Sequence, residues 1–238
     1  MKIYHIPAAP PLYTNTFLLV GENGLAAAVD PAAGAQEYLR LLEQEGARLT
    51  HILLTHGHYD HVGAVEELQR KTGAKVWLAP QDACGGELFP FTTPDNAYAD
   101  GEEIRVDTDL AFRVIATPGH SAGSVCLLCG GLLFSGDTLF AGDVGRTDLP
   151  GGSWDTLRKS LKKLCAAVTE NVQVLPGHLT AGCTFPFAHA AVLSSRRHGL
   201  GDEAAEAKKR KKNKNALSSL SDIKPGDYVV HQSHGIGM

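Results

Sequence analysis

The sequence has no apolar run of about 18 residues, and this absence excludes a transmembrane helix. Its first residues lack the apolar core and cleavage site of a signal peptide, so we expect a cytoplasmic protein. The net charge of −4 gives no overall attraction to nucleic acid or membrane. The 5 cysteines are an odd number without disulfide-framework spacing, which excludes a small disulfide-stabilised secreted domain.

Two of the cysteines, Cys126 and Cys129, have the C-x-x-C spacing of redox and metal sites. They lie in an apolar run that predicts a buried strand. Residues three apart in a strand point to opposite faces, and free cysteine often behaves as a small core residue. We therefore predict two separate core side chains rather than a reactive pair.

The chain up to residue 178 alternates strand-like and helical runs. Strands are predicted over residues 16–20, 26–30, 49–55, 75–79, 112–117, 124–128, 132–135 and 172–175. Helices are predicted over residues 35–46, 61–72 and 154–168, the last with Ser153 as its N-cap. This mixture of hairpin-like and helix-connected strands indicates stacked layers of α and β structure.

The main chemical signal is the segment His56-Gly57-His58-Tyr59-Asp60-His61, directly after a predicted strand. Imidazole and carboxylate groups are the natural ligands of zinc and similar divalent ions. A loop at a strand end lets closely spaced side chains converge, since it is not bound to two-face alternation. The segment predicts a metal site, against the alternative of a polar surface loop.

Three more ligand-type residues occur in a shared context. His120, Asp137 and His178 each follow an apolar run and come directly after a glycine. Glycine allows the sharp turn that directs the next side chain back over the strand end. Each residue alone is typical of a structural turn, but together with the first segment they predict one metal centre.

The order of these motifs resembles the metallo-β-lactamase superfamily over residues 1–178. The segments Thr55–His61, Thr117–His120 and Ser135–Asp137 carry the resemblance, and Asp30 fits the first motif of the family as a group supporting the ligands. The resemblance implies an αββα sandwich, in which two packed mixed sheets are flanked by helices. A disordered C-terminal tail is expected to follow.

The resemblance also implies a ligand set for two divalent ions, zinc in the first place, with iron or manganese as alternatives. His56, His58 and His120 would hold one ion, and Asp60, His61 and His178 the other. Asp137 would bridge both ions. In such centres a metal-bridged hydroxide attacks the substrate, and Asp60 is expected to orient it or transfer a proton.

Departures within the family narrow the expected activity. Antibiotic-degrading members typically carry cysteine where this chain has Asp137, and flavodiiron members carry glutamate where it has His58. The stretch at residues 140–152 resembles small bacterial members of the glyoxalase II group, so a small-molecule thioester is the expected substrate. Arg146 and Asp148 in this stretch are expected to form a structural ion pair, with lining of the substrate path as the alternative.

Two alternatives stay open. A persulfide dioxygenase on the same fold would use one iron held by His56, His120 and Asp137. A protein of another class, a catalytically inactive binding protein, would keep the fold without the chemistry. Metal content and oxygen uptake separate the first alternative from the hydrolase.

The resemblance to the hydrolases breaks after His178. We expect a hydrolase domain over residues 1–198 and a basic disordered linker over 199–216. Residues 217–238 resemble the opening of the CarD-like RNA-polymerase-interacting domain of transcription-repair coupling factor. Too little of that module is present to bury a core, so contact with RNA polymerase is not expected. A frameshift or assembly junction, or a genuine fusion, would explain the tail.

Overall fold

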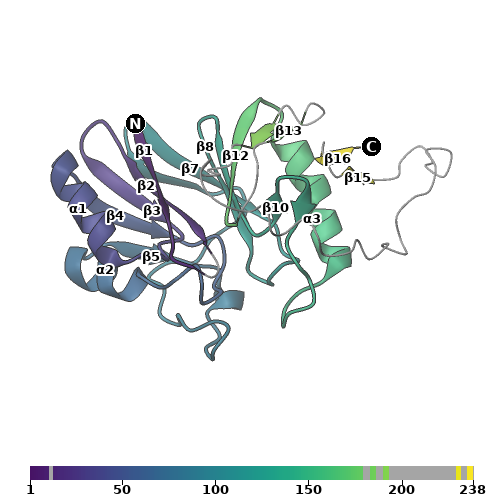
Figure 1. The fold of residues 1–238 in the computed structure, drawn as a ribbon, viewed down its shortest axis with the longest axis horizontal. Helices are drawn as coiled ribbons and strands as arrows, with labels where there is room; N and C mark the ends of the chain where they lie inside the picture. The colour runs from purple at the N-terminus through teal and green to yellow at the C-terminus, as the bar shows by residue number, and fades with distance from the viewer. Residues whose placement is uncertain (11–12, 179–182, 186–189, 193–228, 232–234, 238) are drawn as a thin grey trace, which may run out of the picture.

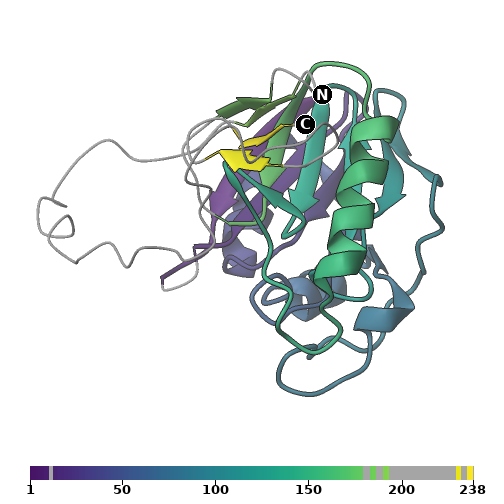
Figure 2. The same cartoon turned by 90° about the vertical axis from the view of Figure 1, so that its right-hand side faces the viewer.

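The computed structural model describes residues 1–10, 13–178, 183–185, 190–192, 229–231 and 235–237. Two mixed β-sheets lie face to face. Helices α1 (Ala35–Glu45) and α2 (Val65–Thr72) cover the outer face of one sheet, and α3 (Trp154–Ala167) covers the outer face of the other (Figures 1 and 2). This is the αββα sandwich that the sequence predicted.

The first sheet has the order β1-β2-β3-β4-β5. Its strands are β1 (Lys2–Pro7), β2 (Asn15–Val20), β3 (Leu25–Val29), β4 (Arg48–Leu53) and β5 (Lys75–Trp77). The first three strands are antiparallel, whereas β3, β4 and β5 are parallel. The parallel pairs require crossover connections, and α1 and α2 provide them.

The second sheet has the order β13-β14-β12-β9-β8-β7-β6 among the described residues. Its strands are β6 (Glu103–Asp107), β7 (Leu110–Ala116), β8 (Val125–Cys129), β9 (Leu132–Gly136), β12 (Val172–Pro176), β13 (Cys183–Phe185) and β14 (Ala190–Val192). A small hairpin of β10 (Leu139–Phe140) and β11 (Asp143–Val144) follows β9, and a single 3₁₀ turn, η1 (Pro80–Asp82), follows β5.

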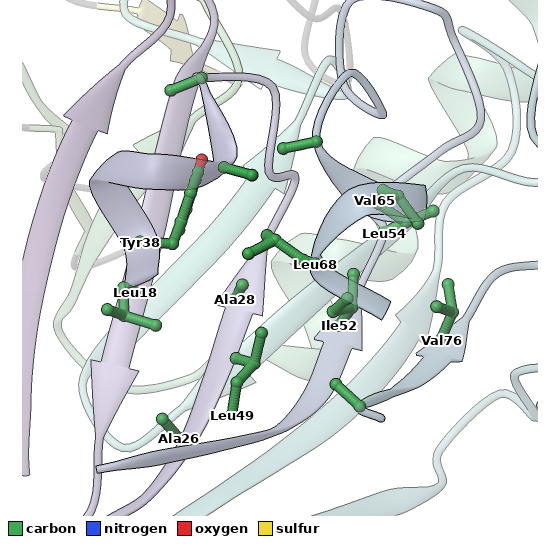
Figure 3. Close-up of a cluster of buried hydrophobic side chains, with 14 of the residues drawn as sticks. Leu18, Ala26, Ala28, Tyr38, Leu49, Ile52, Leu54, Val65, Leu68 and Val76 are labelled. Atoms are coloured by element: carbon green, nitrogen blue, oxygen red, sulfur yellow. The ribbon is translucent and has the colours of Figure 1, made fainter. Parts of the chain in front are cut away.

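Three apolar clusters hold the layers together. The cluster between the first sheet and its helices includes Tyr38, Ile52 and Leu68, all fully buried (Figure 3). A second cluster, which includes Leu53 and Phe134, fills the space between the sheets, and a third packs α3 on the second sheet. Burial of apolar area on both faces of each sheet is the main stabilising term of such a fold.

The two C-x-x-C cysteines are confirmed as separate core residues. On β8, Cys126 belongs to the cluster under α3, whereas Cys129 belongs to the cluster between the sheets. They therefore face opposite sides of the strand. Burial raises the pKa of both thiols to about 11.

One predicted helix begins later than expected. Helix α2 starts at Val65 rather than His61. The Ala64 amide donates to the carbonyl of Pro31 instead of continuing a helical ladder backwards, and the His61 amide closes a turn on His58. The turn keeps the ligand-type side chains converging on one point, which regular helical spacing would prevent.

The tail expectations fall mostly outside the described residues. The predicted linker 199–216 lies outside them, and so does the disorder expected there. Within residues 217–238, β15 (Val229–His231) pairs antiparallel with β16 (Gly235–Gly237). The CarD-like interpretation and the domain boundaries stay predictions. Among the described residues, no helix has the length and apolarity needed to cross a membrane.

The burial of Cys126 and Cys129 predicts that alkylating agents react selectively with the exposed cysteines. At pH 8 a thiol with a pKa of about 11 is thiolate in only about one molecule in a thousand, and only the thiolate reacts with alkylating agents. Iodoacetamide should therefore label the exposed Cys84 and spare Cys126 and Cys129 in the native protein. Peptide mass spectrometry measures the sites. Equal labelling of Cys84 and Cys126, without unfolding, would contradict the packing.

Candidate metal centre

The candidate site lies where strands of the two sheets end. The segment His56–His61 follows β4, and His120, Asp137 and His178 follow β7, β9 and β12. Strands β7 and β9 both pair antiparallel with β8, and β12 is parallel to β9, so their carboxyl ends share one edge of the second sheet. The structure brings all seven predicted side chains together there.

The glycines before the ligand-type residues act as predicted at two positions. Gly119 has φ of 141° and Gly136 has φ of 48°, both in the region that favours glycine. Gly177 serves through size instead of conformation. A Cβ atom there would lie 2.4 Å from Asp137 Oδ1, so a larger residue would displace a carboxylate of the site.

The first group of ligand atoms belongs to His56, His58 and His120, which are all buried. His58 Nδ1 lies 2.9 Å from His120 Nε2. Burial lowers the pKa of His58 to about 4, and burial together with the neighbouring His61 lowers the pKa of His56 well below its usual value. Near pH 7 both rings are therefore neutral and offer lone pairs.

The second group belongs to Asp60, His61 and His178. His178 Nε2 lies 3.0 Å from Asp60 Oδ2 and 3.3 Å from His61 Nε2. Burial opposes charge on His61, but the carboxylates of Asp137 and Asp30 outweigh it and raise the pKa well above its usual value. Burial also opposes charge on His178, but the hydrogen bond with Asp60 and the carboxylate charges of Asp137 and Asp60 together outweigh it and raise the pKa of this ring. A metal bound here replaces protons that these rings otherwise hold.

Asp137 lies between the two groups. Its Oδ1 is 3.5 Å from His61 Nε2, and its Oδ2 is 3.5 Å from His120 Nε2 and 3.4 Å from His178 Nε2. Burial alone would raise the pKa of this carboxyl, but the imidazoles of His61, His178 and His120 together outweigh burial and lower it. The carboxylate form is therefore held between rings of both groups, where a bridging ligand would stand.

Buried atoms without partners show that these residues fit a metal. Within the described part of the chain, His56 Nε2, His58 Nε2 and Asp137 Oδ1 are buried and have no hydrogen-bond partner. A buried polar atom left unpaired costs roughly 1–3 kcal/mol, so native proteins rarely keep several at one place. Coordination by a cation removes this cost for atoms that face it.

Asp30 supports the second group from behind, as expected from the sequence. Its Oδ2 lies 3.0 Å from His61 Nδ1 and accepts from the Thr55 hydroxyl, and its Oδ1 accepts from the Thr55 amide. Asp30 also lies with His56 and His61 in a third group of possible ligand atoms, but hydrogen bonds already engage both of its oxygens, as in a residue that supports a ligand. It holds His61 with Nε2 directed to the centre.

His120 is fixed in the same manner by the backbone. Its Nδ1 lies 2.8 Å from the carbonyl oxygen of Arg146, which leaves Nε2 for the centre. The Arg146 side chain forms the expected ion pair with Asp148, with two nitrogen–oxygen distances of 2.7 Å. Because both side chains are exposed, this pair contributes little to stability.

Asp82, which contacts two of the ligand loops, was missed by the sequence reasoning. It is fully buried, and its carboxylate bonds with Gly57, Ser121 and Gly123. An aspartate in a Pro-Gln-Asp turn is ordinarily a surface residue. Only the three-dimensional packing of η1 against the two loops reveals its position.

Two packed sheets with a histidine–aspartate centre at their strand ends are the architecture of the metallo-hydrolases. Residues 9–178 match the family described as the metallo-beta-lactamase superfamily, and the chain belongs to that superfamily. The resemblance stated from the motifs is thereby confirmed at the level of the superfamily.

Individual relatives differ in their named activities. A hydroxyacylglutathione hydrolase of Alkalilimnicola ehrlichii is 38% identical over 189 residues, covering 79% of this chain and 69% of the relative. The crystal structure of BLEG-1 B3 metallo-beta-lactamase has a TM-score of 0.67 at 30% identity, covering 75% of this chain and 92% of that one. ETHE1 from Myxococcus xanthus has a TM-score of 0.66 at 30% identity, covering 76% of each chain.

The contact between Asp30 and His61 predicts an effect on metal affinity. Asp30 has φ of 46°, a conformation that asparagine tolerates, so Asp30→Asn should keep the backbone and lose the negative charge. Loss of such a partner typically costs about 10–100-fold in metal affinity. Competitive titration with a chromogenic chelator measures it. Asp95→Asn, a carboxylate bound to Lys75, is the matched control, and an unchanged affinity in Asp30→Asn would refute the assigned role.

Proposed function

We propose that the protein is a two-metal hydrolase that cleaves a small-molecule thioester. The observation that carries the proposal is Asp137, a buried carboxylate within 3.5 Å of His61 Nε2 in one group of ligand atoms and of His120 Nε2 in the other. Two divalent ions about 3.5–4 Å apart repel each other, and a shared carboxylate offsets that repulsion. Zinc suits the donor set of imidazole and carboxylate, and iron or manganese suits it too.

Bound metal ions would supply the activation of water and polarise the carbonyl of the substrate. The chain itself supplies the geometry and the proton chemistry. Asp60 Oδ2 accepts from His178 and lies 3.4 Å from the Thr14 hydroxyl. Burial opposes charge on Asp60, but the hydrogen bond to His178 and the imidazoles of His61 and His178 together outweigh it and hold the pKa of this carboxyl well below its usual range. Asp60 is therefore a carboxylate near pH 7, able to orient a water molecule by accepting its proton in a hydrogen bond.

The thioester substrate is supported by the hydroxyacylglutathione hydrolase relative at 38% identity. It is also supported by Asp137, because antibiotic-degrading members of the superfamily typically carry cysteine at this place in the motif. The likeness to BLEG-1 B3 metallo-beta-lactamase makes a β-lactam the necessary comparison substrate.

The second candidate is a mononuclear iron persulfide dioxygenase. It is favoured by the likeness to ETHE1, a persulfide dioxygenase, and by the presence of His56, His120 and Asp137 around one point. That activity leaves the second group of ligand atoms without a role. The second group, with its own supporting Asp30, therefore favours the hydrolase.

The two candidates differ in what His178→Ala does. In the hydrolase the variant loses a ligand of the second ion, so kcat/KM for S-lactoylglutathione should fall by more than about 100-fold. In the dioxygenase, oxygen uptake on glutathione persulfide should change little. A spectrophotometric thioester assay and an oxygen electrode measure the two activities.

His5→Ala is the control, because His5 is an exposed histidine of β1 that bonds to Asn15, outside the ligand set. The wild-type chain should hydrolyse the thioester faster than the chromogenic β-lactam nitrocefin. Oxygen consumption that survives in His178→Ala, with no thioester hydrolysis by the wild type, would establish the dioxygenase and contradict our proposal.

A further inference from the structure

A buried carboxylate outside the seven-residue ligand set joins two of the ligand loops. Asp82 ends the 3₁₀ turn η1 after β5 and is fully buried. A buried carboxylate is costly unless donors satisfy it, so its partners indicate what it is for. No step of the proposed reaction uses Asp82.

All three partners of Asp82 belong to loops that carry ligand-type histidines. Its Oδ2 accepts from the Gly57 amide at 3.1 Å and from the Ser121 hydroxyl at 2.6 Å. Its Oδ1 accepts from the Gly123 amide at 2.7 Å. Gly57 lies between His56 and His58, whereas Ser121 directly follows His120. One carboxylate thus fixes two loops that are far apart in sequence.

The two glycines allow this close contact. A Cβ atom at Gly57 would lie 2.6 Å from the carbonyl oxygen of Asp82, and one at Gly123 would lie 2.7 Å from Asp82 Cγ. Real Cβ atoms do not approach neighbours so closely. Both loops are therefore shaped to receive the carboxylate, each by the absence of a side chain.

The segment after Asp82 holds the same loop at further points. The Tyr59 amide donates to the carbonyl of Leu88 at 3.0 Å, and the ring of Phe89 packs on His58 with centroids 4.8 Å apart. The Phe89 ring thus packs on one side of the His58 ring, while the bond from the Gly57 amide to Asp82 fixes the backbone next to His58. The distance of 2.9 Å between His58 Nδ1 and His120 Nε2 depends on both loops.

We propose that Asp82 is a positioning residue for the first group of ligand atoms, setting His58 against His120. The inference rests on the metal centre proposed above and adds a residue to it. The second group has a different support, since Asp30 bonds to His61, whereas the partners of Asp82 lie in the loops of His58 and His120. Asp82 therefore controls the affinity of one metal position and leaves the other intact.

The test is titration of the metal-free full chain with Co²⁺, followed by its visible absorption bands. Asp82→Asn keeps the shape of the side chain but replaces one acceptor with an NH₂ donor. Each oxygen of Asp82 accepts from a backbone amide, Oδ2 from Gly57 and Oδ1 from Gly123, so either orientation of the asparagine leaves one of these amides without its acceptor. We expect two equivalents of Co²⁺ to bind to the wild type. In Asp82→Asn, one of them should bind about 10–100-fold more weakly.

Reference variants identify which position is lost. His58→Ala removes a member of the first group and His178→Ala a member of the second, so each leaves the spectrum of one occupied position. The spectrum of Asp82→Asn at low Co²⁺ should match that of His58→Ala. A purely structural role for Asp82 would weaken both positions together or neither.

Asp107→Asn is the matched control for general destabilisation. Asp107 is also buried, and it accepts from the amides of Asn23 and Leu25 and from the Asn23 side chain, away from the site. It should lower the melting temperature without changing either Co²⁺ affinity. If Asp82→Asn does not fold, Ser121→Ala takes its place in the test. It removes one donor to Asp82, so it should weaken Co²⁺ binding at the first group of ligand atoms, by a smaller factor than the loss of the carboxylate.

The outcomes separate the two proposals. A wild type that binds no Co²⁺ overturns the metal centre itself. A wild type that binds two equivalents, with Asp82→Asn or its substitute Ser121→Ala binding both as tightly, overturns the role of Asp82 alone. The role of Asp82 is also overturned if Asp82→Asn loses the metal position that His178→Ala loses, instead of the position that His58→Ala loses.

Discussion

The site depends on holding several imidazole and carboxylate groups at one buried point, where little water is available to form hydrogen bonds with them. The histidines of the site, together with Asp60, converge around Asp137 at distances set by loops rather than by regular structure. Such an arrangement is stable only if the loops are fixed from behind. Asp30 and Asp82 do this by bonding to backbone and side-chain donors that face away from the centre.

The fold makes this arrangement possible because strands of both sheets end near one point. The ladders that align β7, β9 and β12 also align the loops that follow them, and each ligand-type residue comes directly after its strand or turn. The apolar clusters on both sides of each sheet keep those ends in place. Protein interiors are dense and deform little, so the packed core keeps the ligand-type side chains at fixed distances from one another.

Much of the site was predictable because its residues are recognisable by type. A histidine or aspartate beside a glycine is by itself typical of a structural turn, but His120 and Asp137 recur in that context together with the segment His56–His61, so the sequence alone was enough to group them. The ligand role of these residues stays a prediction, but their convergence is observed. The supporting role of Asp30 was also predictable, through the resemblance to the superfamily, whose first motif it fits at the end of an early strand.

Other features could not be predicted because their signal is not local. Asp82 has a surface-type context, and only the approach of Gly57 and Gly123 makes it a buried partner. The later start of α2 follows from a backbone bond to Pro31, about thirty residues earlier in the chain, which periodicity does not contain. Strand β6 is a different case, because it was not predicted although it carries a local signal. Charged residues alternate with buried apolar residues from Glu103 to Val106.

The central claim is that the centre holds two metal ions on either side of Asp137. Anomalous X-ray diffraction from crystals of the full chain, recorded across the zinc, iron and manganese edges, tests it most directly. Two bound ions should give two peaks about 3.5–4 Å apart, one beside His56, His58 and His120 and the other beside Asp60, His61 and His178. A single iron peak held by His56, His120 and Asp137, or no peak, would contradict it.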